Sequence, residues 1–223
     1  MDDGTGIRTN SGRRSPPSGP SPRTRPRGDQ ARARLLAAAL QSFVANGFHG
    51  TGTRDIAEAA GMSPAAVYVH YSSKEELLFA LSLAGHQEAL DLVTGADEPH
   101  REPAQRLWSV VNAFCEWHAA NHVNARLVQY ELGSLTPEHA EVIAGVRRQI
   151  SGTVRAILAE GVQAGVFQIR DLNLMVVALM SLSIDIARWY RSDGEWTPAT
   201  IGRHHADIAL SMVGLIDSAP ENS

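Results

Sequence analysis

Two histidines spaced by one helical turn are the first candidates for chemistry in this sequence. His118 and His122 are four positions apart, a spacing that can direct two imidazoles at one metal ion, and Glu116 lies nearby. One hypothesis is therefore a metal-dependent helical enzyme. The helix is expected to end between the two histidines, and no third ligand follows at a suitable spacing. Because the sequence also has no phosphate-binding loop and no Gly-x-Ser-x-Gly motif, we predict no metal, no cofactor and no catalytic residue.

A second candidate is a pair of short helices separated by a glycine. The pattern over residues 53–60 predicts a helix with Thr53 as its N-cap, and Gly61 ends it. Ser63 then caps a second helix over residues 64–71. This geometry lets one helix enter the major groove of DNA, which is about 12 Å wide and admits a slim helix. The second helix has the short side chains that this requires, namely those of Ala65, Ala66 and Val67.

The remainder of the chain has to position these two helices, and its hydrophobic pattern is helical almost throughout. A first helix is expected over residues 30–46, with Gly47 as its stop. Ser73 and Glu76 form a capping box for a fourth helix that continues to about residue 92. Further helices are predicted over residues 104–121, 123–133, 137–164, 171–191 and 198–217. The expected fold is therefore all-α, with nine helices.

Charge is distributed unevenly along the chain. Residues 1–78 contain ten Arg or Lys against seven Asp or Glu, and residues 79–223 contain ten against seventeen, so net charges of +3 and −7 make up the total of −4. This asymmetry predicts a cationic end that faces DNA. We expect a disordered Arg-, Pro- and Ser-rich tail over residues 1–28, a helix-turn-helix domain over 29–78, a ligand-sensing and dimerisation domain over 79–217, and a tail over 218–223. The arginines of the first tail could lie along phosphates, or the tail could be an inert leader.

Cysteine content and hydropathy indicate the compartment. The only cysteine, Cys115, cannot form an intramolecular disulfide, and Met1 is followed by polar residues rather than by the apolar core of a signal peptide. The most apolar run, residues 174–186, is interrupted by two serines and Asp185. We therefore expect a cytoplasmic protein without a membrane-spanning segment.

The segment from Thr53 to Leu77 (TRDIAEAAGMSPAAVYVHYSSKEEL) closely resembles the TetR family of bacterial regulators, and the resemblance extends over about residues 30–80. It implies a dimer whose paired recognition helices read a palindromic operator in double-stranded DNA. It also implies roles by position: Thr53 and Arg54 approach a phosphate and a base, and Tyr68 and His70 contact the DNA backbone. The DNA-binding residues expected in this way are Thr53, Arg54, Pro64, Ala65, Ala66, Tyr68, His70 and Lys74.

Lys74 is expected to hold a phosphate. It is the only lysine among twenty basic residues, and it lies in the first turn of a helix, where free backbone N–H groups already attract anions. The alternative is an ordinary solvated charge. The chain departs from the family pattern at Val69, where relatives often carry a polar or aromatic residue, so no base contact is expected there.

DNA reading needs only some fifty residues, so the rest of the chain is expected to sense a ligand and to dimerise. The helix over 104–121 mixes large aromatic side chains with a few polar atoms, as the lining of a pocket does, although each residue taken singly fits a place in the core at least as well. The predicted pocket residues are Trp108, Val111, Phe114, Trp117, His118, Tyr130, Met175 and Leu179.

The last two predicted helices carry apolar stripes that are too rich for a solvated surface. Resemblance to the family implies that these helices pair with a second copy in a four-helix bundle across a two-fold axis. The predicted interface residues are Leu172, Val176, Ile186, Ile201, Ile208, Met212 and Leu215.

These features predict a ligand-responsive repressor that a small apolar or amphipathic effector releases from its operator. The segment from Arg188 to Arg191 also resembles a subgroup of the family that responds to acyl-CoA thioesters, which makes an acyl-CoA one candidate effector. Besides the metal-dependent enzyme, the remaining alternative is a helical interaction protein that does not read DNA.

Overall fold

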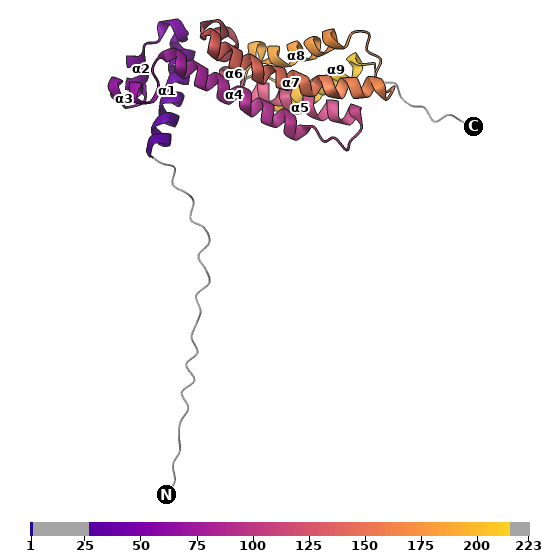
Figure 1. The fold of residues 1–223 in the computed structure, drawn as a ribbon, viewed down its shortest axis with the longest axis horizontal. Coiled ribbons are helices and arrows are strands. Elements are labelled where there is room, and N and C mark those ends of the chain that lie inside the picture. The colour runs from indigo at the N-terminus through magenta and orange to yellow at the C-terminus, as the bar shows by residue number, and fades with distance from the viewer. Residues whose placement is uncertain (2–26, 215–223) are drawn as a thin grey trace, which may run out of the picture.

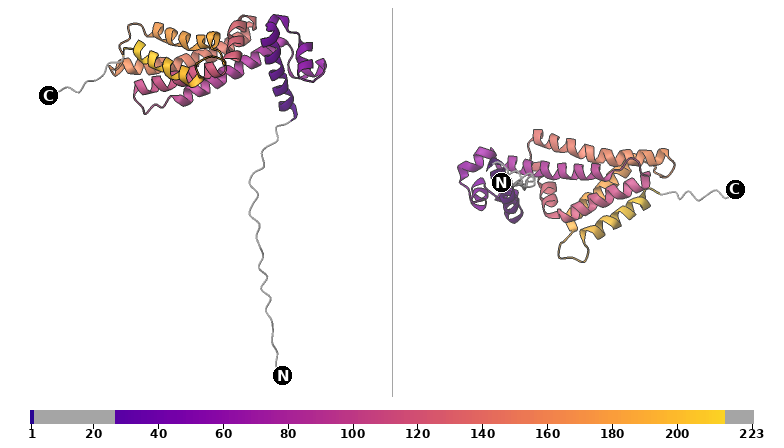
Figure 2. Two further views of the ribbon diagram at one scale, coloured as in Figure 1. Left: turned by 180° about the vertical axis from the view of Figure 1, so that it is seen from behind. Right: turned by 90° about the horizontal axis from the view of Figure 1, so that it is seen from below.

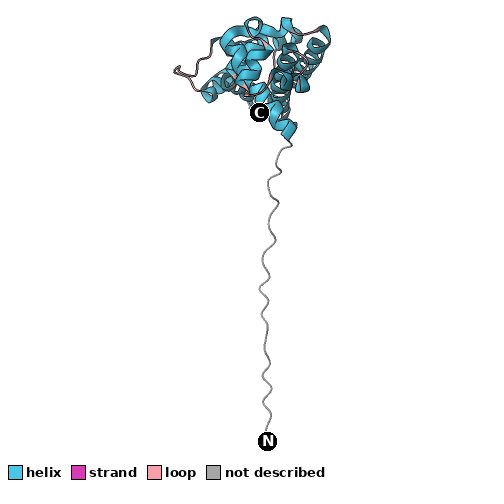
Figure 3. Cartoon of the chain, turned by 90° about the vertical axis from the view of Figure 1, so that its left-hand side faces the viewer, coloured by secondary structure: helices cyan, strands magenta, loops and turns pink. Residues whose placement is uncertain are grey.

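The computed structural model describes residue 1 and residues 27–214, and within this part the chain folds into helices joined by short loops, with no strand (Figures 1 and 3). The first four helices are α1 (Arg27–Gly50), α2 (Thr53–Ala59), α3 (Pro64–His70) and α4 (Lys74–Ala96). They are followed by α5 (Pro103–Ala120), α6 (His122–Glu131), the 3₁₀ turn η1 (Leu132–Ser134), α7 (Pro137–Gln163), α8 (Leu172–Trp189) and α9 (Pro198–Met212). The all-α class and the nine α-helices predicted for this part of the chain are confirmed.

Side-chain caps explain where several helices begin. In each of them a hydroxyl accepts a hydrogen bond from the backbone N–H three residues further on, and the residues concerned are Ser63, Ser73, Thr136 and Thr197. The expected cap Thr53 is instead the first residue of α2. Gly52 precedes Thr53 and is the N-cap residue. Its backbone N–H donates to the Asp55 carboxylate at 2.8 Å, which is the contact between the third helical residue and the N-cap backbone in a capping box.

Two glycines with positive φ set the geometry of the N-terminal helices. Gly47 has φ of +73° and interrupts α1, which then continues for a further turn to Gly50 rather than stopping at residue 46. Gly61 has φ of +64° and makes the turn between α2 and α3. Residues with a Cβ rarely adopt this conformation, so both positions favour glycine.

Two hydrophobic cores are present in the described chain, at opposite ends of the elongated molecule (Figures 1 and 2). The N-terminal core joins α1, α2 and α3 to the start of α4, and Leu127, Leu135 and Ile143 from the α6–α7 region also pack into it. The C-terminal core lies among the end of α4 and helices α5, α7, α8 and α9. The expected domain boundary after residue 78 therefore falls inside α4, which contributes to both cores.

Helix α5 packs against α4, α7, α8 and α9 in the C-terminal bundle. Its contact with α9 is close, because a Cβ on Gly202 would lie only 2.7 Å from the Asn112 carbonyl oxygen. Near the start of α5 the buried Arg106 guanidinium donates to the Asp97 carboxylate at 2.7 Å and to the Glu160 carboxylate. These contacts tie the α4–α5 loop and α7 to the same bundle.

Helix α8 is the one helix in the described residues that is long and apolar enough to cross a membrane by length and composition, with a mean hydropathy of 1.4. One such helix is weak evidence for a membrane span, because a helix in the core of a protein can have the same length and apolar composition. Here α8 packs against α5, α6, α7 and α9, and it carries an ion pair of 2.7 Å between Asp185 and Arg188. Charged groups and neighbouring helices therefore argue for a place in the bundle.

Lys74 fastens the start of α4 to the end of α1. Its ammonium group donates to the carbonyl oxygens of Phe48 at 2.9 Å, Thr51 at 3.1 Å and His49 at 3.4 Å, and it lies 4.6 Å from the centroid of the Phe48 ring. An ammonium group has three hydrogen-bond donors, so these carbonyl groups occupy all of them. The ammonium group thus has a structural role, because α1 ends beside the first turn of α4, and the expected contact of Lys74 with a phosphate stays a prediction.

Replacing Lys74 with Met is expected to lower the free energy of unfolding by about 1–3 kcal/mol, because carbonyl groups of the α1–α2 connection lose their donor. Urea denaturation followed by circular dichroism measures this change. The control is Arg54→Met, which removes an exposed cation and should change the stability by less than about 0.5 kcal/mol. Equal stability of the Lys74→Met and Arg54→Met proteins would contradict this role of Lys74.

Candidate DNA-contact surface and internal pocket

Helix α3 presents one face to solvent and inserts the other into the N-terminal core. Tyr68 and Val69 are 56% and 77% exposed, and Pro64 and Ala65 are exposed beside them. Val67 is 0% exposed and packs in the core. The expectation that Val67 reaches into a groove is therefore wrong, because the turn at Gly61 rotates this position inward, and Ala66 is half-buried.

The first residues of α2 lie against the exposed face of α3. The Thr53 hydroxyl is 3.0 Å from the Tyr68 hydroxyl, which links the two helices on their outer side. Arg54 is exposed and has no ion-pair partner in the described residues, so its guanidinium is available to an anion or a base edge. His70 is half-buried at the end of α3. Thr53 and Tyr68 thus meet on one surface, and Arg54 and Ala65 are exposed on the same two helices, whereas the Lys74 ammonium group makes internal hydrogen bonds.

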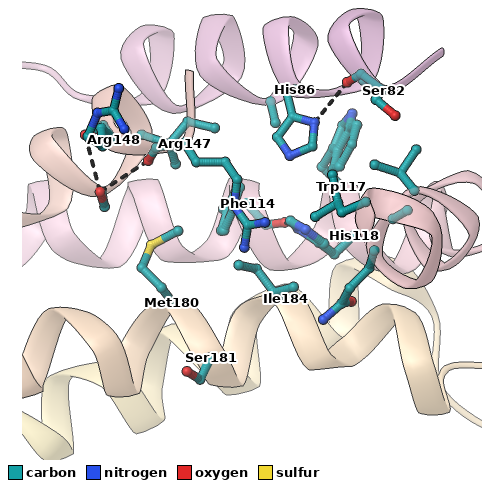
Figure 4. Close-up of a pocket in the computed structure, with 18 of the residues that line it drawn as sticks. Ser82, His86, Phe114, Trp117, His118, Arg147, Arg148, Met180, Ser181 and Ile184 are labelled. Atoms are coloured by element: carbon teal, nitrogen blue, oxygen red, sulfur yellow. Dashed lines mark hydrogen bonds between the residues drawn. The ribbon is translucent and has the colours of Figure 1, made fainter. Parts of the chain in front are cut away.

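A cavity of about 380 Å³ lies in the C-terminal bundle, among α4, α5, α6, α7 and α8 (Figure 4). Of the predicted pocket residues, Phe114, Trp117 and His118 line it. All three are on the C-terminal half of α5, where the helix faces α4 and α6. Cavities of this size with mostly apolar walls are typical of small-molecule sites.

The other predicted pocket residues lie outside the cavity. Trp108 donates its indole N–H to the Asp207 carboxylate at 2.8 Å, and Tyr130 is 65% exposed. Val111 and Leu179 are buried in the C-terminal core, and Met175 packs against that core. These five residues do not line this cavity, because α5, α6 and α8 each pack against several helices and helical spacing alone does not say which neighbour a face meets.

Several lining residues were not among the predicted ones, and those on α4 and α7 come from helices in which no pocket was expected. They are Ser82, His86, Arg147, Arg148, Val176, Met180 and Ile184. Figure 4 shows His86 projecting from α4, and Arg147 extending from α7 into the pocket. Ser82 and His86 interrupt the apolar stripe of α4 one turn apart, and Arg147 and Arg148 are adjacent cations in an acidic part of the chain. Those two irregularities are the signals that could have located the pocket.

Both pocket histidines are held neutral. Burial lowers the pKa of His118 to about 4, although the ring donates from Nδ1 to the Phe114 carbonyl oxygen at 2.9 Å. Burial also lowers the pKa of His86, whose Nδ1 donates to the Ser82 carbonyl oxygen at 2.8 Å. Because each Nδ1 carries the hydrogen, each Nε2 of the neutral ring is a hydrogen-bond acceptor.

The predicted interface residues are divided between the inside and the outside of the chain. Ile186 and Ile201 are 0% and 5% exposed and belong to the C-terminal core, and Val176 lines the pocket, so these three predictions of a surface position are wrong. Leu172, Ile208 and Met212 are half-buried, and Leu215 lies outside the described residues. The exposed apolar side chains of α8 are Leu174, Val177, Leu182 and Trp189.

The two histidines that suggested a metal both bind backbone carbonyl groups of α5. Nδ1 of His118 bonds the Phe114 carbonyl, and Nδ1 of His122 lies 2.9 Å from the Ala119 carbonyl oxygen. Within residues 27–214, no group of three His, Cys, Asp or Glu side chains is placed to hold a metal ion.

Comparison with protein families gives two matches that together span most of the described chain. Residues 35–81 match the family described as "Bacterial regulatory proteins, tetR family", and residues 100–213 match the "Tetracyclin repressor-like, C-terminal domain". The first match covers α2, α3 and the start of α4, and the second covers the bundle that holds the pocket.

Individual relatives agree with these matches. The transcriptional activator FasR of Mycolicibacterium smegmatis is 31% identical over 169 residues, which cover 74% of each chain. A solved bacterial regulatory protein of the tetR family from Rhodococcus RHA1 is 44% identical, with a TM-score of 0.81 over 84% of this chain and 99% of that one. The ketosteroid transcriptional regulator KstR2 of Mycobacterium tuberculosis is 25% identical, with a TM-score of 0.73 over 82% and 94%.

The resemblance found in the sequence is thus confirmed over both halves of the protein. The matched segments contain the exposed face of α3 and the part of the pocket wall that α5, α6, α7 and α8 supply, whereas the pocket residues of α4 lie between the two segments. The chain therefore belongs to the TetR family of transcriptional regulators, which bind DNA through a helix-turn-helix and are not enzymes.

Proposed function

We propose that this protein is a cytoplasmic homodimeric repressor that binds a palindromic operator and leaves it when a small amphipathic effector fills the pocket. The observation that carries the proposal is the course of α4, which begins beside the helix-turn-helix and forms one wall of the pocket. A ligand that changes the position of α4 therefore changes the position of α3. A coupling of about 1–3 kcal/mol is enough to alter DNA occupancy 5- to 150-fold.

The DNA side of the proposal rests on the outer surface of α2 and α3. Ala65 and Tyr68 stand on an exposed helix face of the size that a major groove admits, and Arg54 beside them is an unpaired cation among the described residues. The hydrogen bond between Thr53 and Tyr68 fixes the orientation of the tyrosine before DNA is bound. Small apolar groups offer few hydrogen bonds, so part of the specificity is expected to come from DNA shape.

The effector side rests on the distribution of charge in the pocket. The walls are mostly apolar, Arg147 and Arg148 are the charged residues that line the cavity, and no Asp or Glu does. Arg148 is paired with Glu141 at 2.7 Å, whereas Arg147 has no such partner in the described chain. Apolar walls with an available cation favour an amphipathic anion, and an acyl-CoA thioester is such a molecule.

The dimer is proposed from the outer faces of α8 and α9. Leu174 and Leu182 are 67% and 45% exposed on α8. Leu172 on α8 and Ile208 and Met212 on α9 are half-buried, so part of each side chain is also open to solvent. Exposed apolar side chains on one helix mark an interaction surface when they are contiguous. A second copy would cover them through an isologous contact, because each helix meets its own symmetry mate.

Substituting Ala65 with Glu is expected to abolish DNA binding, because a carboxylate would enter a groove lined by phosphates. Arg54→Ala should weaken binding without abolishing it. Gel-shift titrations at several salt concentrations, with an operator selected from random duplexes, measure both effects. Ala159→Glu, the same substitution at an exposed position of α7, is the control and should bind as the natural protein does. Wild-type affinity of Ala65→Glu would refute the assignment of α3.

Placing arginine at both Leu174 and Leu182 is expected to convert the dimer into a monomer at micromolar concentration, because like charges would meet across the two-fold axis. Analytical ultracentrifugation measures the change. Val162→Arg, at an apolar residue of α7 that is 42% exposed, is the matched control and should leave the dimer intact. A doubly substituted protein that remains dimeric would place the interface elsewhere.

Replacing Arg147 with Gln is expected to weaken the binding of octanoyl-CoA about tenfold, because a charge-assisted hydrogen bond is lost. Isothermal titration calorimetry measures the affinity. Arg155→Gln, further along α7, is the control, because Arg155 bonds Asn173 and does not line the cavity. If both variants bind octanoyl-CoA equally well, Arg147 does not hold the acidic part of the effector.

A further inference from the structure

Three polar atoms on residues of the pocket wall have no hydrogen-bond partner. They are Oγ of Ser82, Nε1 of Trp117 and Oδ1 of Asn124, and each is fully shielded. Only one other buried side-chain atom in the described residues is in this state, Oδ1 of Asn112, which lies at the α5–α9 contact. Buried polar groups are nearly always paired, because leaving one unpaired is costly. Their concentration at one cavity therefore indicates a role in binding.

Two of the side chains that carry unpaired atoms, those of Asn124 and Trp117, meet beside Gly85. A Cβ on Gly85 would lie 3.5 Å from Nδ2 of Asn124 and 3.9 Å from the Trp117 ring. Ser82 is one helical turn before Gly85 on α4, and its carbonyl oxygen accepts the hydrogen bond of His86. Ser82 is 1% exposed, so its hydroxyl is almost wholly enclosed. We call the residues Ser82, His86, Trp117, His118 and Asn124 the polar cluster.

Because of its two histidines, the polar cluster favours a ligand group that donates a hydrogen bond. Each uses Nδ1 to donate to a carbonyl oxygen of its own helix, which leaves Nε2 as an acceptor without a partner in the described chain. The His118 ring is in edge contact with Trp117, with centroids 5.1 Å apart. The indole N–H of Trp117 is a donor and nothing else. The cluster thus offers acceptors and a donor side by side.

A group that fits such a cluster has to donate and accept at the same time. A carbonyl oxygen only accepts, so it would leave both imidazole acceptors unpaired. An ionised carboxylate also only accepts, so it would likewise leave both imidazole acceptors unpaired, and burial keeps both histidines neutral. A methyl group would leave every polar atom of the cluster without a hydrogen-bond partner. A hydroxyl group donates one hydrogen bond and accepts two.

We infer that the effector carries a hydroxyl group on its apolar part, and that this hydroxyl binds in the polar cluster. It donates to Nε2 of His86 or His118 and accepts from the indole N–H of Trp117 or the hydroxyl of Ser82. This inference rests on the proposed function, since it concerns the effector of the same pocket. It narrows the ligand class from an amphipathic anion to a hydroxylated one, such as a hydroxyacyl thioester.

The test compares four thioesters on the full-length protein by isothermal titration calorimetry. The probes are octanoyl-CoA, two hydroxylated derivatives with the hydroxyl near the thioester or on the terminal carbon, and the derivative with a ketone near the thioester. At least one hydroxylated probe is expected to bind about tenfold more tightly than octanoyl-CoA, and more tightly than the ketone. That probe should also release DNA at a correspondingly lower concentration.

Two matched pairs of variants locate the effect. Trp117→Phe removes the indole donor of the cluster, and Trp108→Phe removes the same group at the contact with Asp207 outside the pocket. His118→Phe removes one acceptor, and His122→Phe removes an imidazole that does not line the pocket. The preference for the hydroxylated probe should fall to about twofold or less in the first member of each pair and persist in the second. Octanoyl-CoA itself should bind the two control variants, Trp108→Phe and His122→Phe, as it binds the natural protein, because neither residue lines the cavity.

The outcomes separate this inference from the proposed function. If octanoyl-CoA binds and releases DNA but no hydroxylated probe binds more tightly, the inference is overturned and the proposed repressor stands. A hydroxyl preference that survives both Trp117→Phe and His118→Phe also overturns it, because the hydroxyl then binds elsewhere. If none of the thioesters binds, both the inference and the proposed effector class fail.

Discussion

Helix α4 has to belong to two hydrophobic cores at once, and this constraint organises the molecule. Leu77 and Leu78 are buried in the N-terminal core, whereas Ala89 and Val93 are buried in the C-terminal core. Between these two pairs the helix contributes residues to the pocket wall. Protein interiors are close-packed and transmit small displacements, so a shift of α4 on one core is felt by the other. The fold therefore joins the pocket wall to the N-terminal core through α4, together with the residues of α6 and α7 that pack into that core.

The orientation of α3 depends on very few contacts. Val67 is its fully buried anchor, Gly61 sets the direction from which the helix leaves α2, and Thr53 meets Tyr68 on the outside. Lys74 closes the unit by joining the start of α4 to the end of α1. Because these contacts are few, most of α3 stays open to solvent, which suits a helix that enters a groove.

The unpaired polar residues of the pocket lower the stability of the folded protein. A bundle selected only for stability would replace Ser82 and Asn124 by apolar residues or provide partners for them, because unpaired buried polar atoms raise the free energy of the folded state. In the proposed complex the same atoms would gain a partner from the ligand. The apolar walls would then supply affinity, Arg147 would suit an acidic group, and the polar cluster would supply discrimination.

The sequence by itself determined the helices, their caps and the family, because these depend on short-range patterns. Ser63, Ser73 and Gly61 act within a turn of their own positions, and the segment from Thr53 to Leu77 carries the resemblance without any distant contact. Only the tertiary structure decided which helix faces which. It placed Trp108 and Ile186 away from their predicted sites, brought His86 and Arg147 to one cavity, and gave Lys74 to the carbonyl groups of α1. The physical reason is that a helix has a fixed period but no intrinsic partner, so the neighbour that each face meets is set by packing across the whole chain.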